Sequence, residues 1–294
     1  MRNNKKLFKF LKVTPFLVFL ILFGNGCSNL GKININSKKE NDIDKYSKVV
    51  ALTSLTADIV NKLSPKSLVA IPGSSLFKNK EEFSNKIVVS QGRTPPNLEK
   101  IISLQPDLVL GAKGFHDKPL SQINNLGIQT ITTEVRNLED LNLLVEKISN
   151  YLEVDNPSLY SFAPFCYKSD QDISSDSTVV LVSSAPLLSP NKNSWAGSLL
   201  DEFSINNLIR NIQSKSGFDG YVTLSPEVLL DKNPDNIILV DTGNDMKKSF
   251  LNKSYASNLK AVNNDNIYTF NYYGLINPGS MESINDACAK LKNI

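Results

Sequence analysis

Histidine is almost absent from this sequence, and His116 is the only one among 294 residues. A zinc or manganese site built from several histidines is therefore excluded. A Ser-His-Asp triad would have to use His116, but no G-x-S-x-G motif accompanies it. The nucleotide pattern G-x-x-x-x-G-K-[ST] and the zinc-protease pattern H-E-x-x-H are also missing. We expect His116 to be a solvated loop residue, and the lack of catalytic motifs favours a binding protein over an enzyme.

Cysteine is scarce as well, and the first of the three follows a short apolar run. The run Val13–Gly24 comes after a basic segment and is too short to span a bilayer comfortably, which is typical of a secretory signal peptide. It leads into "GNGCS", and this ending resembles a bacterial lipoprotein signal. The resemblance implies that Cys27 is lipidated and becomes the mature N-terminus, although Gly24 departs from the usual leucine.

The other two cysteines, Cys166 and Cys288, leave two interpretations open. In an exported protein they can form a disulfide bond, because the compartment outside the membrane is oxidising. Equally, the two cysteines can be unpaired and buried in the core, where a free cysteine behaves as a small apolar residue. Connectivity cannot be derived from spacing alone.

Charge of one sign is not concentrated in the folded part of the chain. The formal net charge is +3, and much of it lies in the first dozen residues. A nucleic-acid-binding protein would gather lysine and arginine on one face, so this class is disfavoured. With 41% hydrophobic and 21% charged residues the composition is that of a globular protein, and the length suggests about two domains.

One phrase occurs twice, once in each half of the chain. "PNLEKIISLQPDLVL" and "SPEVLLDKNPDNIIL" align Glu99 with Glu227 and Asp107 with Asp235. In each copy a residue that caps helices well, Asn97 or Ser225, precedes the helix, a glutamate lies in the first turn and a proline ends the helix. An aliphatic run follows, which is typical of a buried parallel strand. The repeat predicts two similar α/β lobes.

The alternation of strand-like and helix-like segments extends this scheme over the whole chain. We expect two Rossmann-like lobes with parallel sheets, joined by a helical connection that Pro164 would kink or shorten. The expected division is a signal peptide, a polar tether, an N-terminal lobe, a connecting segment and a C-terminal lobe, at residues 1–27, 28–47, 48–152, 153–177 and 178–294.

These features resemble the substrate-binding proteins of bacterial ABC importers, in particular the class that captures ferric siderophores, haem and cobalamin. The resemblance covers nearly everything from Val49 to Ile294, and "RTPPNLE" is similar to the pattern in ferric-hydroxamate binders. It implies two α/β lobes joined by a long rigid helix, with the ligand in a shallow cleft between them. It also implies a lipid-anchored envelope protein that acts as a monomer with a permease dimer and a separate ATPase.

The family also offers a role for the two first-turn glutamates. In it, one glutamate per lobe docks onto arginines of the permease dimer, and Glu99 and Glu227 match those positions. A carboxylate can accept a bidentate contact from arginine, and two similar lobes suit a two-fold partner. The plainer interpretation is that each carboxylate only stabilises its helix through the helix dipole.

Candidate ligand contacts come from the loops at the carboxyl ends of the expected strands, where open parallel sheets bind ligands. Arg93 matches the arginine that binds hydroxamate oxygens in similar siderophore binders, and its planar fork suits an anionic chelate. The full set of expected ligand contacts is Ser54, Arg93, Phe115, Trp195, Tyr221 and Tyr273.

The resulting interpretation is a binding protein for an iron chelate, a hydroxamate-type siderophore in the first instance. Cobalamin or haem is the alternative within the class, and cobalamin would depend more on Trp195 and the tyrosines than on Arg93. An exported enzyme or a structural lipoprotein on the same scaffold is the alternative from another class. We expect no cofactor, no metal held by side chains and no nucleic-acid partner.

Overall fold

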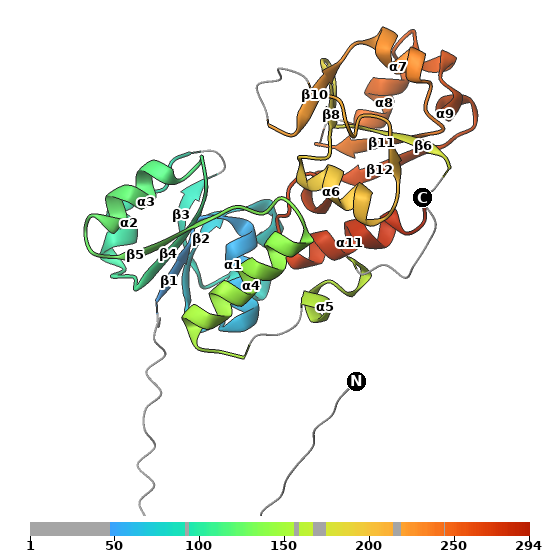
Figure 1. The fold of residues 1–294 in the computed structure, drawn as a ribbon. Coiled ribbons are helices and arrows are strands. Elements are labelled where there is room, and N and C mark those ends of the chain that lie inside the picture. Colours follow the sequence, from blue (N-terminus) through green and yellow to red (C-terminus); the bar gives the residue numbers. More distant parts are fainter. Residues whose placement is uncertain (1–47, 92–93, 156–158, 167–174, 214–218, 244) are drawn as a thin grey trace, which may run out of the picture. The chain divides into compact units, whose positions relative to one another are not determined.

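Five parallel strands form the sheet of the N-terminal half in the computed structural model of the chain (Figure 1). Their order is β3-β2-β1-β4-β5, so β1 is the central strand, with β2 and β3 on one side of it and β4 and β5 on the other. The strands are β1 (Val49–Ala51), β2 (Leu68–Gly73), β3 (Ile87–Gln91), β4 (Leu108–Ala112) and β5 (Gln129–Thr133). The structure describes residues 48–91, 94–155, 159–166, 175–213, 219–243 and 245–294.

The helices of this half begin where the sequence supplies a capping side chain. Thr53, Asn97 and Asn137 each accept a hydrogen bond from a backbone N–H in the first turn that follows. The helices are α1 (Ser54–Leu63), α2 (Leu98–Ser103), α3 (Asp117–Asn124) and α4 (Leu138–Leu152), with 3₁₀ turns η1 (Ser75–Phe77) and η2 (Glu81–Phe83).

The C-terminal half contains a second parallel sheet, in the order β12-β11-β6-β9. Its strands are β6 (Ser177–Leu181), β9 (Asn206–Asn207), β11 (Asn236–Asp241) and β12 (Ile267–Asn271). The helical segments are α6 (Trp195–Glu202), α7 (Pro226–Lys232), α8 (Met246–Leu251), η4 (Ala256–Asn258), α9 (Lys260–Asn263), α10 (Tyr272–Leu275) and α11 (Met281–Leu291). The two α/β lobes expected from the repeat are therefore confirmed.

A small antiparallel sheet in the C-terminal half goes beyond the sequence prediction. It has the order β10-β8-β7 and consists of β7 (Ser183–Ser184), β8 (Leu187–Pro190) and β10 (Tyr221–Leu224). Strands of two to four residues are too short to show a hydrophobic period, which explains why only parallel pairing was expected.

The repeated phrase has the same structural role in both halves. Asn97 and Ser225 cap α2 and α7, and the aspartate after each proline then binds the start of a neighbouring strand. The Asp107 carboxylate accepts from the Lys48 N–H at 3.1 Å, just before β1. The Asp235 carboxylate accepts from the N–H of Ser177, the first residue of β6, at 2.9 Å. The aspartate thus aligns two parallel strands at their amino ends.

Only short helical turns connect the halves within the described residues. Between α4 and β6 these are α5 (Leu159–Phe162) and η3 (Pro164–Cys166). Pro164 opens η3, which accords with the expectation that it shortens the connection. A disulfide between Cys166 and Cys288, with Cα atoms 4.9 Å apart, fastens η3 to α11 and resolves the question that the sequence left open.

Helix α11 joins the two halves at its amino end as well. The N–H of Met281 donates to the buried Asp58 carboxylate of α1 at 2.8 Å, and Lys80 forms an ion pair with Glu282. One hydrophobic cluster extends from Leu55 and Leu141 in the first half to Trp195 and Ile284 in the second. The halves are therefore joined by a continuous core.

None of the helices in the described part of the chain is long and apolar enough to cross a membrane. The expected signal peptide, the polar tether and Cys27 lie outside the described residues.

Candidate functional site

A pocket of about 360 Å³ is bounded by residues from both halves of the described chain. The N-terminal half contributes Arg136 and Asn137, which come shortly after the carboxyl end of β5. The C-terminal half contributes a set of mostly polar side chains from the loop after β8, from α6 and from the segment before β10: Lys192, Asn193, Ser198 and Asp219. The lining is strongly polar, and sequence reasoning named none of these six residues.

Two carboxylates lie near the Arg136 guanidinium at unequal distances. Its Nη2 lies 2.6 Å from an oxygen of Glu134 and 3.9 Å from an oxygen of Asp219. Lys113 donates to the other oxygen of Glu134 at 2.8 Å. Hydrogen bonding from Lys113 and then Arg136 lowers the pKa of the Glu134 carboxyl, so Glu134 stays ionised and holds both cations at this edge of the sheet.

The backbone around Arg136 is fixed by the start of α4. The Arg136 N–H donates to the Asp140 carboxylate at 2.9 Å, while Asn137 caps the helix by accepting from the Asp140 N–H at 2.7 Å. Asp140 thus binds the backbone N–H of the residue just before the N-cap Asn137, while Asn137 binds the N–H of Asp140. The side chain of Arg136 therefore projects from an anchored position at the pocket.

On the opposite side, the loop 191–194 presents Lys192 and Asn193. The buried Asn191 side chain accepts from the Asn193 N–H at 2.9 Å and donates to the Ile212 carbonyl at 2.9 Å. The Lys192 N–H donates to the Arg210 carbonyl at 3.1 Å. The loop thus has a defined conformation before any ligand arrives.

The loop after β4 carries Lys113, Phe115 and His116. Phe115 is 87% exposed, which is unusual for a phenylalanine and consistent with a side chain open to a ligand or partner. His116 differs from the expected solvated residue, because it is half-buried and its Nδ1 accepts from the Ala112 N–H at 3.0 Å. Burial lowers the pKa of this imidazole, which must be neutral to accept that bond.

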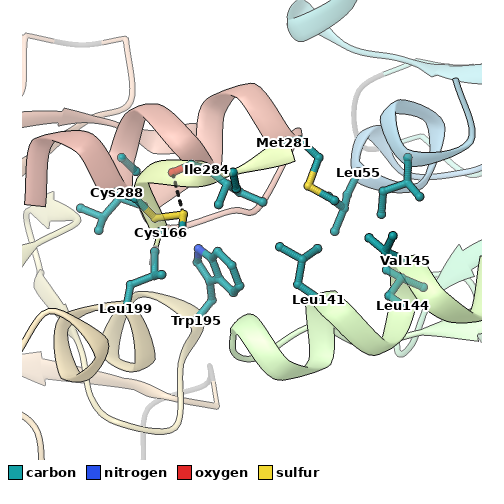
Figure 2. Close-up of a cluster of buried hydrophobic side chains, with 14 of the residues drawn as sticks. Leu55, Leu141, Leu144, Val145, Cys166, Trp195, Leu199, Met281, Ile284 and Cys288 are labelled. Carbon is teal, nitrogen blue, oxygen red and sulfur yellow. Dashed lines mark hydrogen bonds between the residues drawn. A yellow bond between two sulfur atoms is a disulfide. The ribbon is translucent and has the colours of Figure 1, made fainter. Parts of the chain in front are cut away.

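The structure places Trp195 in the core, where it is 4% exposed, and its indole N–H donates to the Gly274 carbonyl at 2.7 Å. Figure 2 shows the ring beside Leu199 and the Cys166–Cys288 disulfide. A ring so enclosed and satisfied packs the C-terminal half, and a direct ligand contact of Trp195 stays a prediction.

Tyr221 and Tyr273 lie near Trp195 in the same half. Tyr221 is half-buried against the core, and burial, with a smaller contribution from Tyr272, raises the pKa of its phenol. The rings of Tyr272 and Tyr273 meet edge to face with centroids 5.5 Å apart. The structure therefore brings three of the expected aromatic contacts into one neighbourhood, while their contact with a ligand stays a prediction.

The remaining expected contacts belong to the first half. Ser54, at the start of α1, donates to the Ser74 hydroxyl at 3.2 Å, so it lies at the carboxyl edge of the first sheet as expected. Arg93, the residue expected to bind hydroxamate oxygens, lies outside the described residues.

The two glutamates expected to dock a permease are both exposed, each in the first turn of its helix. Hydrogen bonding from Ser225 lowers the pKa of Glu227, which keeps it charged. The geometry is compatible with docking and equally with stabilisation of α2 and α7, so docking stays a prediction.

Two further features limit the choice of site. A wider hollow of about 470 Å³ is lined by residues at the amino ends of β1, β2 and β3, among them Lys48, Leu68 and Ile87. Open parallel sheets bind ligands at the opposite edge, at the carboxyl ends of their strands, so this hollow is not the candidate ligand site. Within the described part of the chain, no group of three or more histidine, cysteine, aspartate or glutamate side chains is arranged to hold a metal ion.

Comparison with known proteins agrees with this architecture. A putative ABC transporter substrate-binding lipoprotein of Bacillus subtilis (strain 168), YhfQ, is 25% identical over 192 residues, which span 60% of this chain and 59% of the relative's length. A possible iron-binding (periplasmic solute-binding) protein from Staphylococcus epidermidis superposes with a TM-score of 0.68 at 16% identity and covers 85% of this chain and 98% of its own. The vitamin B12-binding protein BtuF of Vibrio cholerae gives 0.65 at 18% identity, over 85% of this chain and 96% of its own.

The two solved structures are too distant in sequence to show more than a shared fold. The family model described as periplasmic binding protein matches residues 49–151 and 168–272, in both halves of the chain. The interval between the matched parts contains α5 and η3, where the connection is short. The chain belongs to the periplasmic binding protein family.

Proposed function

We propose that this chain is the substrate-binding component of an ABC importer, and that it captures an iron chelate of the siderophore type and delivers it to a membrane permease. The observation that carries the proposal is the polar pocket lined from both halves, near the carboxyl edge of the first sheet, in a member of the periplasmic binding protein family. Binding without turnover is the proposed activity, and a separate ATPase supplies the energy.

The chelate class rests on the relatives. The Bacillus protein is described as an ABC transporter substrate-binding lipoprotein, and the two structural neighbours as a possible iron-binding protein and a vitamin B12-binding protein. Iron chelates and corrinoids share a bulky, partly apolar body with polar edges, and the exposed Phe115 follows β4 at the same carboxyl edge of the sheet as Arg136. Cobalamin or haem is the alternative ligand.

Partners and location follow from the same proposal. Glu99 and Glu227 are the proposed docking residues, one for each subunit of a two-fold permease. Lipid attachment at Cys27 and the polar segment 28–47 would keep the protein at the outer face of the membrane, in the periplasm or cell envelope. The protein acts as a monomer in this proposal.

Equilibrium titration of the purified protein tests the proposal. The probes are an uncharged iron(III) trihydroxamate, haem, cyanocobalamin and an anionic iron(III) complex of a citrate-bridged dihydroxamate whose arms carry further carboxylates that do not bind the iron. Saturable one-to-one binding of an iron(III) chelate, measured by calorimetry or by ligand absorbance, is the expected result. Saturable binding of haem or cyanocobalamin alone would favour the alternative ligand, and failure of all four probes to bind a folded protein would contradict the function.

A further inference from the structure

We infer that the pocket between Arg136 and Lys192 binds a negatively charged group at the periphery of the ligand, with a carboxylate as the best match. This inference rests on the proposed function, because it names the ligand chemistry that this site selects. It predicts that the preferred chelate carries a free carboxylate in addition to the groups that hold its iron.

The charges that line the pocket favour an anion. Two of the six lining residues are cations and one, Asp219, is an acid. The Asp219 side chain is 82% exposed and lies 3.9 Å from Arg136, so water screens it and the pairing is weak. A ligand carboxylate that enters the pocket can displace this loose contact and gain a closer one.

Arg136 retains donors for a ligand. A guanidinium has five N–H groups in a planar fork, and the two carboxylates near Arg136 both approach the same nitrogen, Nη2. Glu134 at 2.6 Å fixes the direction of the fork. The group is thus oriented in advance, which lowers the entropy lost when a carboxylate binds.

Lys192 lies in the loop 191–194, which packs closely against two glycines, Gly197 and Gly220. A Cβ atom on Gly197 would lie 1.9 Å from the Asn191 carbonyl oxygen and 3.0 Å from the Lys192 Cα. Gly220, at a φ of 78°, would place a Cβ 2.9 Å from the Ser194 nitrogen. The loop is therefore packed closely on both sides, and within the described residues the Lys192 ammonium has no ion-pair partner.

Neutral groups of the pocket complete its polar lining. Asn193 and Ser198 supply an amide and a hydroxyl that can donate to a second carboxylate oxygen. Helix α6 begins at the pocket with no acidic residue in its first turn, so its positive end adds to the field of the two cations. The volume of about 360 Å³ suits a peripheral arm together with part of the chelate body.

The test compares the four probes on the full-length wild-type protein and on two single variants, Arg136→Ala and Lys192→Ala. The tightest-binding probe should be one with free carboxylates, the citrate-bridged complex or haem. Each variant should weaken the binding of that probe about tenfold. This is the lower end of the range for a hydrogen bond to a charged group, because both residues are exposed. Lys147→Ala removes an exposed lysine from α4 and should leave the affinity unchanged.

A fourth variant tests whether a negative charge in the pocket weakens the binding of an anionic chelate. Asp219→Asn removes the competing acid, so the anionic probe should bind more tightly, by up to about fivefold. Weaker binding to this variant would contradict the inference, since Asp219 would then be a ligand contact in its own right.

The outcomes separate this inference from the function on which it rests. If the uncharged trihydroxamate or cyanocobalamin binds most tightly, or if both basic variants bind the best probe as well as the wild type does, the anion site is wrong while the importer function stands. If no probe binds the folded wild-type protein, the proposed function itself is contradicted and the anion site with it.

Discussion

At the scale of single residues, His116 shows how a lone histidine can be structural. Its Nδ1 accepts from the Ala112 backbone, and the half-buried ring has a lowered pKa because burial disfavours the charged form. The sequence indicated only a loop histidine, because a hydrogen bond to a residue four positions earlier depends on how the chain turns after β4.

This environment predicts a pH dependence. As the pH falls below about 6.5, the unfolded chain takes up a proton at His116 before the folded protein does, so the folded state loses stability in that interval. The loss should stay below about 1 kcal/mol, since the ring is only half-buried. Urea unfolding of the wild type and of His116→Asn at pH 7.5 and 5.5 measures it.

The asparagine oxygen can replace Nδ1 as acceptor without titrating. The difference in unfolding free energy between the two proteins should therefore shift in favour of the variant at the lower pH. An unchanged difference between pH 7.5 and 5.5 would mean that His116 titrates normally in the folded protein.

At the scale of elements, the close approach of α6 to the loop 191–194 decides where the pocket forms. Gly197 permits it, because any Cβ there would overlap the Asn191 carbonyl. Backbone atoms cannot move aside as the end of a flexible side chain can, so a larger residue must displace the helix or the loop.

Gly197→Ala should therefore destabilise the protein by about 1–3 kcal/mol, the usual range for forcing an extra carbon into a packed site. It should also weaken chelate binding by shifting Lys192. Ala196→Gly is the matched control, since it changes the neighbouring buried position without adding volume. It should destabilise by about 1 kcal/mol through lower helix propensity, with a further loss from the buried methyl group that it removes, and should leave chelate binding unchanged. Equal stability of Gly197→Ala and the wild type would show that α6 does not need the glycine.

Local signals in the sequence predicted the elements well, but they named none of the six residues that line the pocket. Asn97 and Ser225 cap helices as expected, since capping depends on a few adjacent residues. The pocket escaped prediction because it brings Arg136 within reach of Lys192 and Asp219 from the other lobe. A single tryptophan gives no local sign of burial either, and the bond from Trp195 to Gly274 spans 79 residues.

At the scale of the whole molecule, the two halves share one continuous hydrophobic cluster and a disulfide. The disulfide closes a loop with a sequence separation of 122 residues. Restricting the unfolded chain over so long a loop stabilises the folded state, and removal of a disulfide typically costs about 2–4 kcal/mol.

Cys166→Ala/Cys288→Ala should therefore unfold at lower urea concentration than the oxidised wild type, still in one transition because the core is shared. Reductant should lower the urea concentration at which the wild type unfolds to about that of the variant, and it should leave the unfolding of the variant unchanged. Two separate transitions in the oxidised wild type would contradict the single shared core.

The proposed docking to a permease also belongs to the scale of the whole molecule. Charge reversal at both exposed glutamates, Glu99→Lys/Glu227→Lys, should abolish chelate uptake by cells while the purified variant binds its chelate with wild-type affinity. The matched control reverses two other exposed glutamates, Glu146 and Glu202, and should transport normally. Loss of binding in solution by a folded Glu99→Lys/Glu227→Lys variant would place these carboxylates in the ligand site instead.

We propose that a chelate binds between the two halves, with Arg136 and Lys192 at its periphery. The most direct measurement is a crystal structure of the protein saturated with its tightest-binding chelate. We predict that the chelate occupies the pocket of about 360 Å³, with a carboxylate within hydrogen-bond distance of both cations. A chelate bound at the amino edge of the first sheet, or anywhere remote from Arg136 and Lys192, would contradict the account.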